Sequence, residues 1–241
     1  MPISKTFVYN RLEHAFNDLL ELFFPSLCVT CGNRLISQEK FVCMNCWLDL
    51  PVTGYHLEPE NKVEQLFWGR VQIERATSWF HYRKGSSYQQ LIHFIKYKGM
   101  KELGLECGKR LGRSLAEAEN FQTVDEIIPV PLHPKKLKKR GYNQSEWIAR
   151  GVAEVLQKPV VSDNLLRKIH TSTQTQKTRL ERWQNVEGVF KINHPESVAE
   201  KHILLIDDVT TTGATLEACA VPLLNCEKTK VSIATLAYAD F

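Results

Sequence analysis

The stretch that decides the fold runs from Ile203 to Thr215 and reads ILLIDDVTTTGAT. Its four apolar residues predict a buried strand, and two carboxylates follow where that strand ends. Open parallel sheets bind their ligands at this end of their strands. Three threonines and a glycine then lead into a helix predicted over residues 215–224, so backbone N–H groups and hydroxyls converge on one point. The stretch therefore predicts a phosphate-binding turn within an α/β fold.

The two halves of this stretch predict different contacts. Asp207 and Asp208 would repel a phosphate, so we expect them to accept hydrogen bonds from sugar hydroxyls and to order a hydrated divalent cation. This interpretation requires both acids to avoid the interior and the glycine turn to stay open to solvent. A strand-to-helix turn with a hydroxyl-rich cap, as in many nucleotide-binding folds, is the simpler alternative. The residues expected around the phosphate are Thr210, Thr211, Thr212, Gly213, Ala214 and Thr215.

Short apolar segments alternate with amphipathic ones through most of the chain. Strands are predicted at residues 77–82, 127–130, 158–161, 190–192, 203–206 and 230–237, and helices at residues 88–97, 103–118, 144–156 and 215–224. Asn143, followed three residues later by Glu146, forms a capping-box pattern that starts the third of these helices. This alternation predicts an α/β fold with a parallel twisted sheet flanked by helices.

Two Cys-x-x-Cys pairs stand eleven residues apart near the N-terminus. Each pair fits a tight turn that presents two sulfurs to one ion, and two such turns complete a closed, structural zinc site. A disulfide pair, or a redox-active motif without metal, is the alternative. Four sulfurs leave no open position, so this metal would serve folding or docking. The expected ligands are Cys28, Cys31, Cys43 and Cys46, whereas Cys107, Cys219 and Cys226 are expected in the core.

Composition bounds the class of protein. Of 241 residues, 43% are hydrophobic and 24% are charged, and the net charge is only +4. These values are typical of a globular protein and imply no global attraction to polyanions. No apolar run approaches a membrane span and the first residues lack a secretory signal, so we expect a cytoplasmic protein without membrane insertion. An amphipathic helix is predicted over residues 7–24, a helix and zinc module over residues 1–60, and the α/β domain over residues 61–241.

The stretch from Ile203 to Thr215 resembles the signature of type I phosphoribosyltransferases. With further segments, it resembles the ComF family of competence-associated, phosphoribosyltransferase-like proteins over nearly the whole chain, from Phe23 to Tyr238. The further segments are the two cysteine pairs, IPVPLH at residues 128–133, RGYNQ at residues 140–144, and Thr173, Gln176, Leu180, Arg182, Asn185, Val186, Gly188 and Phe190.

This resemblance implies a ligand and its contacts. It implies that Asp207 and Asp208 contact the ribose hydroxyls of phosphoribosyl pyrophosphate and that magnesium accompanies the diphosphate. It also implies that residues 210–215 cradle the 5′-phosphate. A pyrophosphate-binding loop is implied at residues 131–134, and a loop that closes over the reacting centre at residues 167–177. The candidate pyrophosphate ligands are Leu132, His133, Arg140, Arg167, Lys177 and Arg182.

The segment from Lys135 to Arg140 carries five basic residues among six. Such a cluster favours a pyrophosphate or an acidic polymer such as single-stranded DNA, and a solvated basic turn is the simpler alternative. We expect His133 and Arg140 to point inward while lysines remain in water. Trp147 and Trp183 are expected to pack within the protein rather than to stack on bases.

Three functions stay open, because the sequence identifies no acceptor. The first is an enzyme that transfers phosphoribose to an unknown acceptor. The second is a non-catalytic adaptor that senses phosphoribosyl pyrophosphate, for which the ComF resemblance implies a role beside a competence helicase and incoming single-stranded DNA in natural transformation. The third is a DNA-binding protein with a path along residues 96–101 and 135–140.

Overall fold

The computed structural model describes residues 24–168 and 188–239, which belong to two compact units that divide between Leu50 and Pro51. The helix predicted over residues 7–24 falls outside the described residues apart from its last one. Within the described ranges, no helix is both long and apolar enough to cross a membrane. Each unit is described by itself below.

The first unit holds the cysteine pairs on two turns. The first turn is closed by a bridge between Leu27 and Arg34. Helix α2, Met44–Leu48, begins directly after Cys43. Cys28 is buried, and its sulfur accepts a hydrogen bond from the Cys43 N–H over 3.3 Å. The two turns therefore meet at their cysteines.

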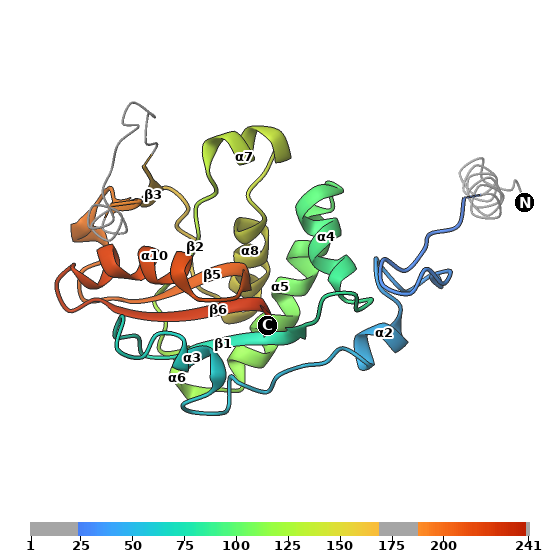
Figure 1. Cartoon of the computed structure of the whole chain (residues 1–241), viewed down its shortest axis with the longest axis horizontal. Coiled ribbons are helices and arrows are strands. Elements are labelled where there is room, and N and C mark those ends of the chain that lie inside the picture. Colours follow the sequence, from blue (N-terminus) through green and yellow to red (C-terminus); the bar gives the residue numbers. More distant parts are fainter. Residues whose placement is uncertain (1–23, 169–187, 240–241) are drawn as a thin grey trace, which may run out of the picture. The chain divides into compact units, whose positions relative to one another are not determined.

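The second unit is built on a four-stranded parallel sheet in the order β1-β6-β5-β2 (Figure 1). Its strands are β1, Ala76–Tyr82; β2, Glu126–Pro129; β5, His202–Thr210; and β6, Lys230–Ala239. The residues from Ile203 to Ile206 are fully buried, which matches the inner position of β5. The predicted parallel sheet is confirmed, and all four strands end on the same side of the unit.

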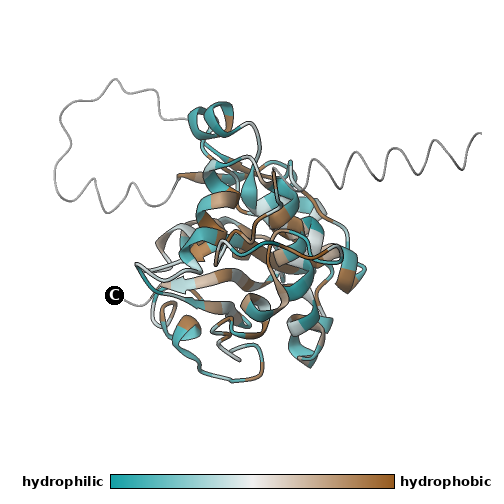
Figure 2. Ribbon diagram, turned by 90° about the vertical axis from the view of Figure 1, so that its right-hand side faces the viewer, coloured by the Kyte–Doolittle hydropathy of each residue, from teal (hydrophilic) through white to brown (hydrophobic). Residues whose placement is uncertain are grey.

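Helices cover this sheet on both faces. The described helices of this unit are α3, Lys62–Gln65; α4, Gln89–Tyr97; α5, Lys101–Ala116; α6, Glu119–Gln122; α7, Pro134–Arg140; α8, Gln144–Leu156; and α10, Ala214–Leu224, with a 3-10 turn at Pro195–Ser197. Ile203 and Leu205 of β5 pack in one apolar cluster with residues of α3 and α10. Side chains alternate along a strand, so Leu204 and Ile206 face the opposite side, where α8 packs. Figure 2 shows apolar residues along the strands and polar residues on outer helical turns.

Helices α5 and α8 touch backbone to backbone through glycines. A Cβ built on Gly108 would lie 2.2 Å from the Ile148 carbonyl oxygen, and one on Gly151 would lie 2.1 Å from the Leu105 carbonyl oxygen. At Gly104, one turn before Gly108, the nearest atoms would lie 3.5 Å away, which is ordinary contact. The glycines therefore set the separation of the two helices, and with it the position of the start of α8.

Several elements differ from the prediction. Strand β3, Leu165–Arg167, and strand β4, Phe190–Ile192, form a separate antiparallel pair rather than joining the main sheet. The strand predicted at residues 158–161 is reduced to one bridge between Ile127 and Val160. Three-residue strands carry too little pattern to reveal their partners. Asn143 caps α8 by accepting from the Ser145 N–H, whereas Glu146 pairs with Arg150.

The segment after Leu50 already belongs to the second unit. The Thr53 N–H donates to the Trp79 carbonyl over 2.9 Å, and the His81 N–H donates to the Pro51 carbonyl over 2.8 Å. Both partners are residues of β1. The domain boundary expected at residue 60 lies further along the chain than this pairing.

Candidate functional site

Two acids stand at the end of strand β5. Because β5 continues to Thr210, Asp207 and Asp208 belong to the strand rather than to the loop after it. The Ser145 hydroxyl donates to Asp207 Oδ1 over 2.8 Å, and the Asp208 N–H donates to the same oxygen over 2.9 Å. The Lys96 ammonium lies 3.0 Å from Asp208 Oδ1. Side chains from α8 and α4 therefore hold the two acids.

The two carboxylates have different surroundings. Asp207 is partly buried, and burial together with the Asp208 charge raises its pKa to about 7, although hydrogen bonds from Ser145 and the Asp208 N–H oppose the rise. Asp208 is only 4% exposed and pairs with Lys96. The expectation that both acids avoid the interior is wrong for Asp208, because an extended strand directs successive side chains to opposite faces. Asp207 keeps partial access to solvent.

Two polar atoms beside these acids lack a partner. Asp208 Oδ2 and Thr210 Oγ1 are buried without a hydrogen bond to any described residue. Leaving such a group unsatisfied costs about 1–3 kcal/mol, which a bound ligand or ordered water would recover. The side-chain oxygens at this strand end suit a hard cation such as magnesium. The residues present therefore fit that ion by donor type.

The turn after β5 is open on one side and packed on the other. Thr211, Thr212 and the first residues of α10 are exposed. Gly213 is buried at the N-terminus of α10 with a φ of +73°, and a Cβ built on it would lie 3.0 Å from Phe67 Cε1. Thr211 and Thr212 are open to solvent but Gly213 and Thr210 are not, so the requirement for an open turn is met only in part. Gly213 is needed for its left-handed backbone and for the ring packed against it, a constraint the sequence did not reveal.

The basic segment forms a helix rather than a loop. Pro134 and Gly141, with a φ of +83°, bound α7, and His133 Nδ1 accepts from the Lys135 N–H over 3.2 Å. The Arg140 guanidinium donates to Gln144 and lies 5.4 Å from the centre of the Tyr97 ring. The residues facing partly inward are Leu132, His133 and Arg140, and the exposed ones include Lys135, Lys136, Lys138 and Lys139.

The four cysteines of the first unit converge. Their sulfurs all lie within 4.8 Å of one another, and the Cys31 and Cys43 sulfurs are 3.7 Å apart. A tetrahedral zinc ion would separate its sulfurs by about 3.8 Å. Burial raises the pKa of Cys28, but backbone N–H donors near it prevail and lower that pKa to about 6. The cluster is compatible with a structural zinc ion.

Comparison with known proteins agrees with this geometry. Residues 143–240 match the phosphoribosyl transferase domain family. The chain is 29% identical over 212 residues to the DNA utilization protein YhgH of Salmonella typhimurium, covering 85% of this chain and 87% of that protein. It is 25% identical over 206 residues to competence protein F of Haemophilus influenzae, covering 80% and 89%. The chain is thus similar over most of its length to proteins of the ComF family.

A third relative matches a shorter part of the chain. The chain is 35% identical over 98 residues to competence protein ComFC of Bacillus subtilis, covering 41% of this chain and 38% of that one. The parallel sheet, its flanking helices and the matched domain identify the type I phosphoribosyltransferase fold. The fold implied by the resemblance is therefore confirmed, and the relatives' names support the ComF family.

The remaining candidate residues lie on the separate strand pair or outside the described residues. Arg167 is on β3, and its guanidinium lies 5.3 Å from the centre of the Phe190 ring. Lys177, Arg182 and Trp183 fall in the part of the chain that the structure does not describe. Ser145 and Lys96 were not predicted to touch the acids. Lys96 was assigned to a DNA path, whereas it forms an ion pair with Asp208.

A cavity of about 530 Å³ lies between the two basic segments. It is lined by Lys101 of α5, by Arg140 of α7 and by the start of α8. The Trp147 ring lies 4.8 Å from the Lys101 ammonium and 5.0 Å from the Arg150 guanidinium. Trp147 is partly buried and is packed by cations, in line with the expected packing role. The fold thus brings together segments that are about forty residues apart in sequence.

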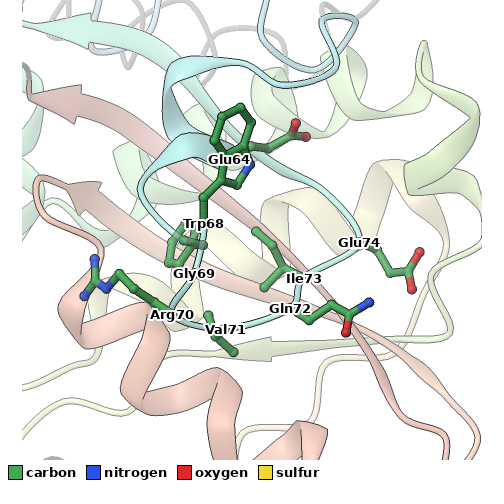
Figure 3. Close-up of a pocket in the computed structure, with 9 residues that line it drawn as sticks. Glu64, Trp68, Gly69, Arg70, Val71, Gln72, Ile73 and Glu74 are labelled. Atoms are coloured by element: carbon green, nitrogen blue, oxygen red, sulfur yellow. The ribbon is translucent and has the colours of Figure 1, made fainter.

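A second cavity, of about 550 Å³, opens in the turn that follows α3 (Figure 3). Its lining includes Glu64, Trp68, Arg70 and Glu74, and neither acid of β5 contributes to it. Trp68 is 58% exposed, and Arg75 donates to Glu64 over 2.6 Å. No motif in the sequence marked this turn as functional.

Proposed function

We propose that this protein binds phosphoribosyl pyrophosphate together with magnesium at the end of β5 and the start of α10. The observation that carries the proposal is the acid pair directly before a turn of exposed threonines and a helix N-terminus. The turn offers hydroxyls and backbone N–H groups to the 5′-phosphate. Asp207, which keeps access to solvent, suits the ribose hydroxyls.

Magnesium would be held by Asp207 and Asp208 and would neutralise charge on the departing diphosphate. In the free protein, Ser145 orients the Asp207 carboxylate, and Lys96 offsets the charge of Asp208. Thr210 contributes a hydroxyl that has no partner among the described residues. These groups supply orientation of the sugar and its ester rather than a strong base.

For the pyrophosphate we propose Leu132, His133, Arg140 and Arg167, with Lys177 and Arg182 outside the described residues. His133 caps α7 and Arg140 bonds Gln144 in the free protein, so binding requires these two side chains to exchange their contacts. If an acceptor is supplied, the bond from the anomeric carbon to the pyrophosphate oxygen breaks and a bond to the acceptor forms. Release of pyrophosphate with a panel of nucleobases and amines separates this enzyme from a non-catalytic sensor.

A second candidate function is single-stranded DNA binding, which the cavity between the two basic segments favours. A groove lined by Lys101, Arg140 and Arg150 suits the phosphates of a polynucleotide backbone. The relatives' names, DNA utilization protein and competence protein F, support a role in DNA uptake. A competence helicase is the partner that we propose for that role. Affinity that survives Asp207→Ala, yet collapses when Lys101 and Arg140 are neutralised, would support this function, and an affinity insensitive to salt would contradict it.

We propose that the first unit is a zinc module that docks a partner. We also propose that the protein acts in the cytoplasm. The mutual approach of four sulfurs supports zinc as the metal. Metal analysis of the purified protein tests the module directly. If the protein keeps its full folding stability without zinc, the proposed structural role of zinc is wrong.

Calorimetry with magnesium and phosphoribosyl pyrophosphate tests the main proposal. We expect binding by the wild-type chain and at least about tenfold weaker binding by Asp207→Asn, because a charge-assisted hydrogen bond is worth about 1.5–3 kcal/mol. Asp163→Asn serves as the matched control, since Asp163 is an exposed carboxylate in the loop before β3. Absence of binding by the wild-type chain, or equal effects of both variants, would overturn the proposal.

A further inference from the structure

Arg70 contacts the turn between β5 and α10, where the 5′-phosphate is proposed to bind. Its Nη1 donates to the Thr212 carbonyl over 2.7 Å and to the Leu66 carbonyl over 2.8 Å, and its Nη2 forms an ion pair with Glu217 of α10. Arg70 stands on the turn that lines the cavity in Figure 3. One guanidinium therefore ties the segment after α3 to the turn and to the helix that follows it.

The contact at Thr212 constrains the next residue. In a trans peptide, the carbonyl of one residue and the N–H of the next point in opposite directions. No peptide bond of the described residues is cis. The bond from Arg70 to the Thr212 carbonyl therefore directs the Gly213 N–H away from Arg70. Within residues 24–168 and 188–239, no group accepts a hydrogen bond from that N–H.

Gly213 is also the residue of the turn at which the backbone rotates most easily. Glycine has no Cβ, so rotation of the peptide before it meets little steric resistance. A flip of the 212–213 peptide would turn a carbonyl oxygen toward the position of the phosphate, where it would repel the anion. Phe67, three residues before Arg70, packs against Gly213, and a Cβ built on Gly213 would lie only 3.0 Å from its ring. One short segment thus supplies both the packing and the hydrogen bond that fix this peptide.

We infer that Arg70 is a positioning residue that keeps the Gly213 N–H directed at a bound 5′-phosphate. This inference rests on the proposed function, because it assigns a role within the same site. Arg70 acts through the Thr212 carbonyl, and Glu217 pairs with its charge. Its removal weakens ligands that carry the 5′-phosphate and leaves the affinity for pyrophosphate alone unchanged.

Calorimetry of the full chain with magnesium tests this inference, using phosphoribosyl pyrophosphate, ribose 5-phosphate and inorganic pyrophosphate as probes. Arg70→Met removes the donors and keeps the apolar stem, and Arg70→Lys restores one cation that reaches a single acceptor. Arg75→Met is the matched control, because Arg75 bonds Glu64 and the Glu58 carbonyl in the same segment, and none of its side-chain hydrogen bonds to described residues reaches the turn. The Gly213 amide signal of glycine-labelled protein reports the peptide itself.

We expect Arg70→Met to weaken both 5′-phosphate ligands by about tenfold, which is the worth of one hydrogen bond to a charged group. Arg70→Lys falls between it and the wild type, and Arg75→Met binds as the wild type does even if it melts earlier. The Gly213 amide signal shifts on adding ribose 5-phosphate in the wild type and not in Arg70→Met.

Wild-type affinity in Arg70→Met would overturn the inference while leaving the proposed function in place. An equal loss of pyrophosphate affinity would also overturn it, because the role would then be structural only. A wild-type chain that binds neither 5′-phosphate ligand would overturn the inference and the proposed function together.

Discussion

The glycine contact between α5 and α8 predicts that Gly108→Ala destabilises the protein. The added Cβ would lie 2.2 Å from the Ile148 carbonyl oxygen and 3.1 Å from the Gly151 Cα, and neither backbone atom can rotate away. Overpacking of this kind costs about 1–3 kcal/mol, and the gain in helix propensity returns about 1 kcal/mol. The clash with backbone favours the upper end, so we expect a net loss of about 2 kcal/mol.

The melting temperature should fall by about 4–8 °C, since 1 kcal/mol shifts it by about 2–4 °C in a chain of this size. Urea unfolding followed by circular dichroism measures the free energy, with Gly104→Ala as the control on the same helix. A Cβ on Gly104 makes only ordinary contacts, so this variant should be unchanged or about 1 kcal/mol more stable. The reasoning is refuted if Gly108→Ala is as stable as Gly104→Ala.

Three further outcomes follow from buried polar groups and the cysteines. Lys96→Met should lower the free energy of unfolding by about 3 kcal/mol in denaturant, because Asp208 loses its ion pair. Adding Asp208→Asn to this variant should restore most of the lost stability. If the double variant is no more stable than Lys96→Met, the ion pair does not stabilise the protein. His202 is buried between Thr123 and Ser232 and its pKa lies below the ordinary 6.5 because of burial, so the folded protein resists protonation there. The contribution of neutral His202 to folding stability is full above pH 6.5 and declines as the pH falls below that value. If the unfolding free energy of a His202→Gln variant falls with pH as steeply as that of the wild type, this explanation is wrong. A zinc chelator should make residues 24–50 sensitive to protease, and unchanged protection would argue against a metal.

Strand β5 and helix α10 were predictable because the residues that define them lie in one short run of sequence. Four apolar residues, two acids and a glycine turn identify β5 and α10 whatever the rest of the chain does. Asn143 likewise predicted the start of α8, because asparagine is a common N-cap residue. The four cysteines carry their own spacing, and the structure brings them together. In each case the signal lies within one short segment.

The partners of these elements were not predictable, because contacts between distant segments leave no pattern in sequence. Lys96 reaches Asp208 across more than one hundred residues, and Arg70 reaches Thr212 across 142. Asp208 is buried because β5 continues past Ile206. The sequence did not reveal this continuation, because the residues after Ile206 are mostly polar. Helix α7 was hidden by its charge, although the proline after His133 and the glycine at residue 141 are typical helix boundaries.

The pairing of Pro51 and Thr53 with β1 decides where this chain can be shortened. β1 is an outermost strand, and an uncovered strand edge is a template on which further copies add and aggregate. Val52 bridges Phe80 in antiparallel fashion and shields part of that edge. A protein that begins at residue 51 keeps this shield, whereas one that begins at residue 61 exposes the edge. The few residues that leave the cysteine turns thus protect the sheet from self-association.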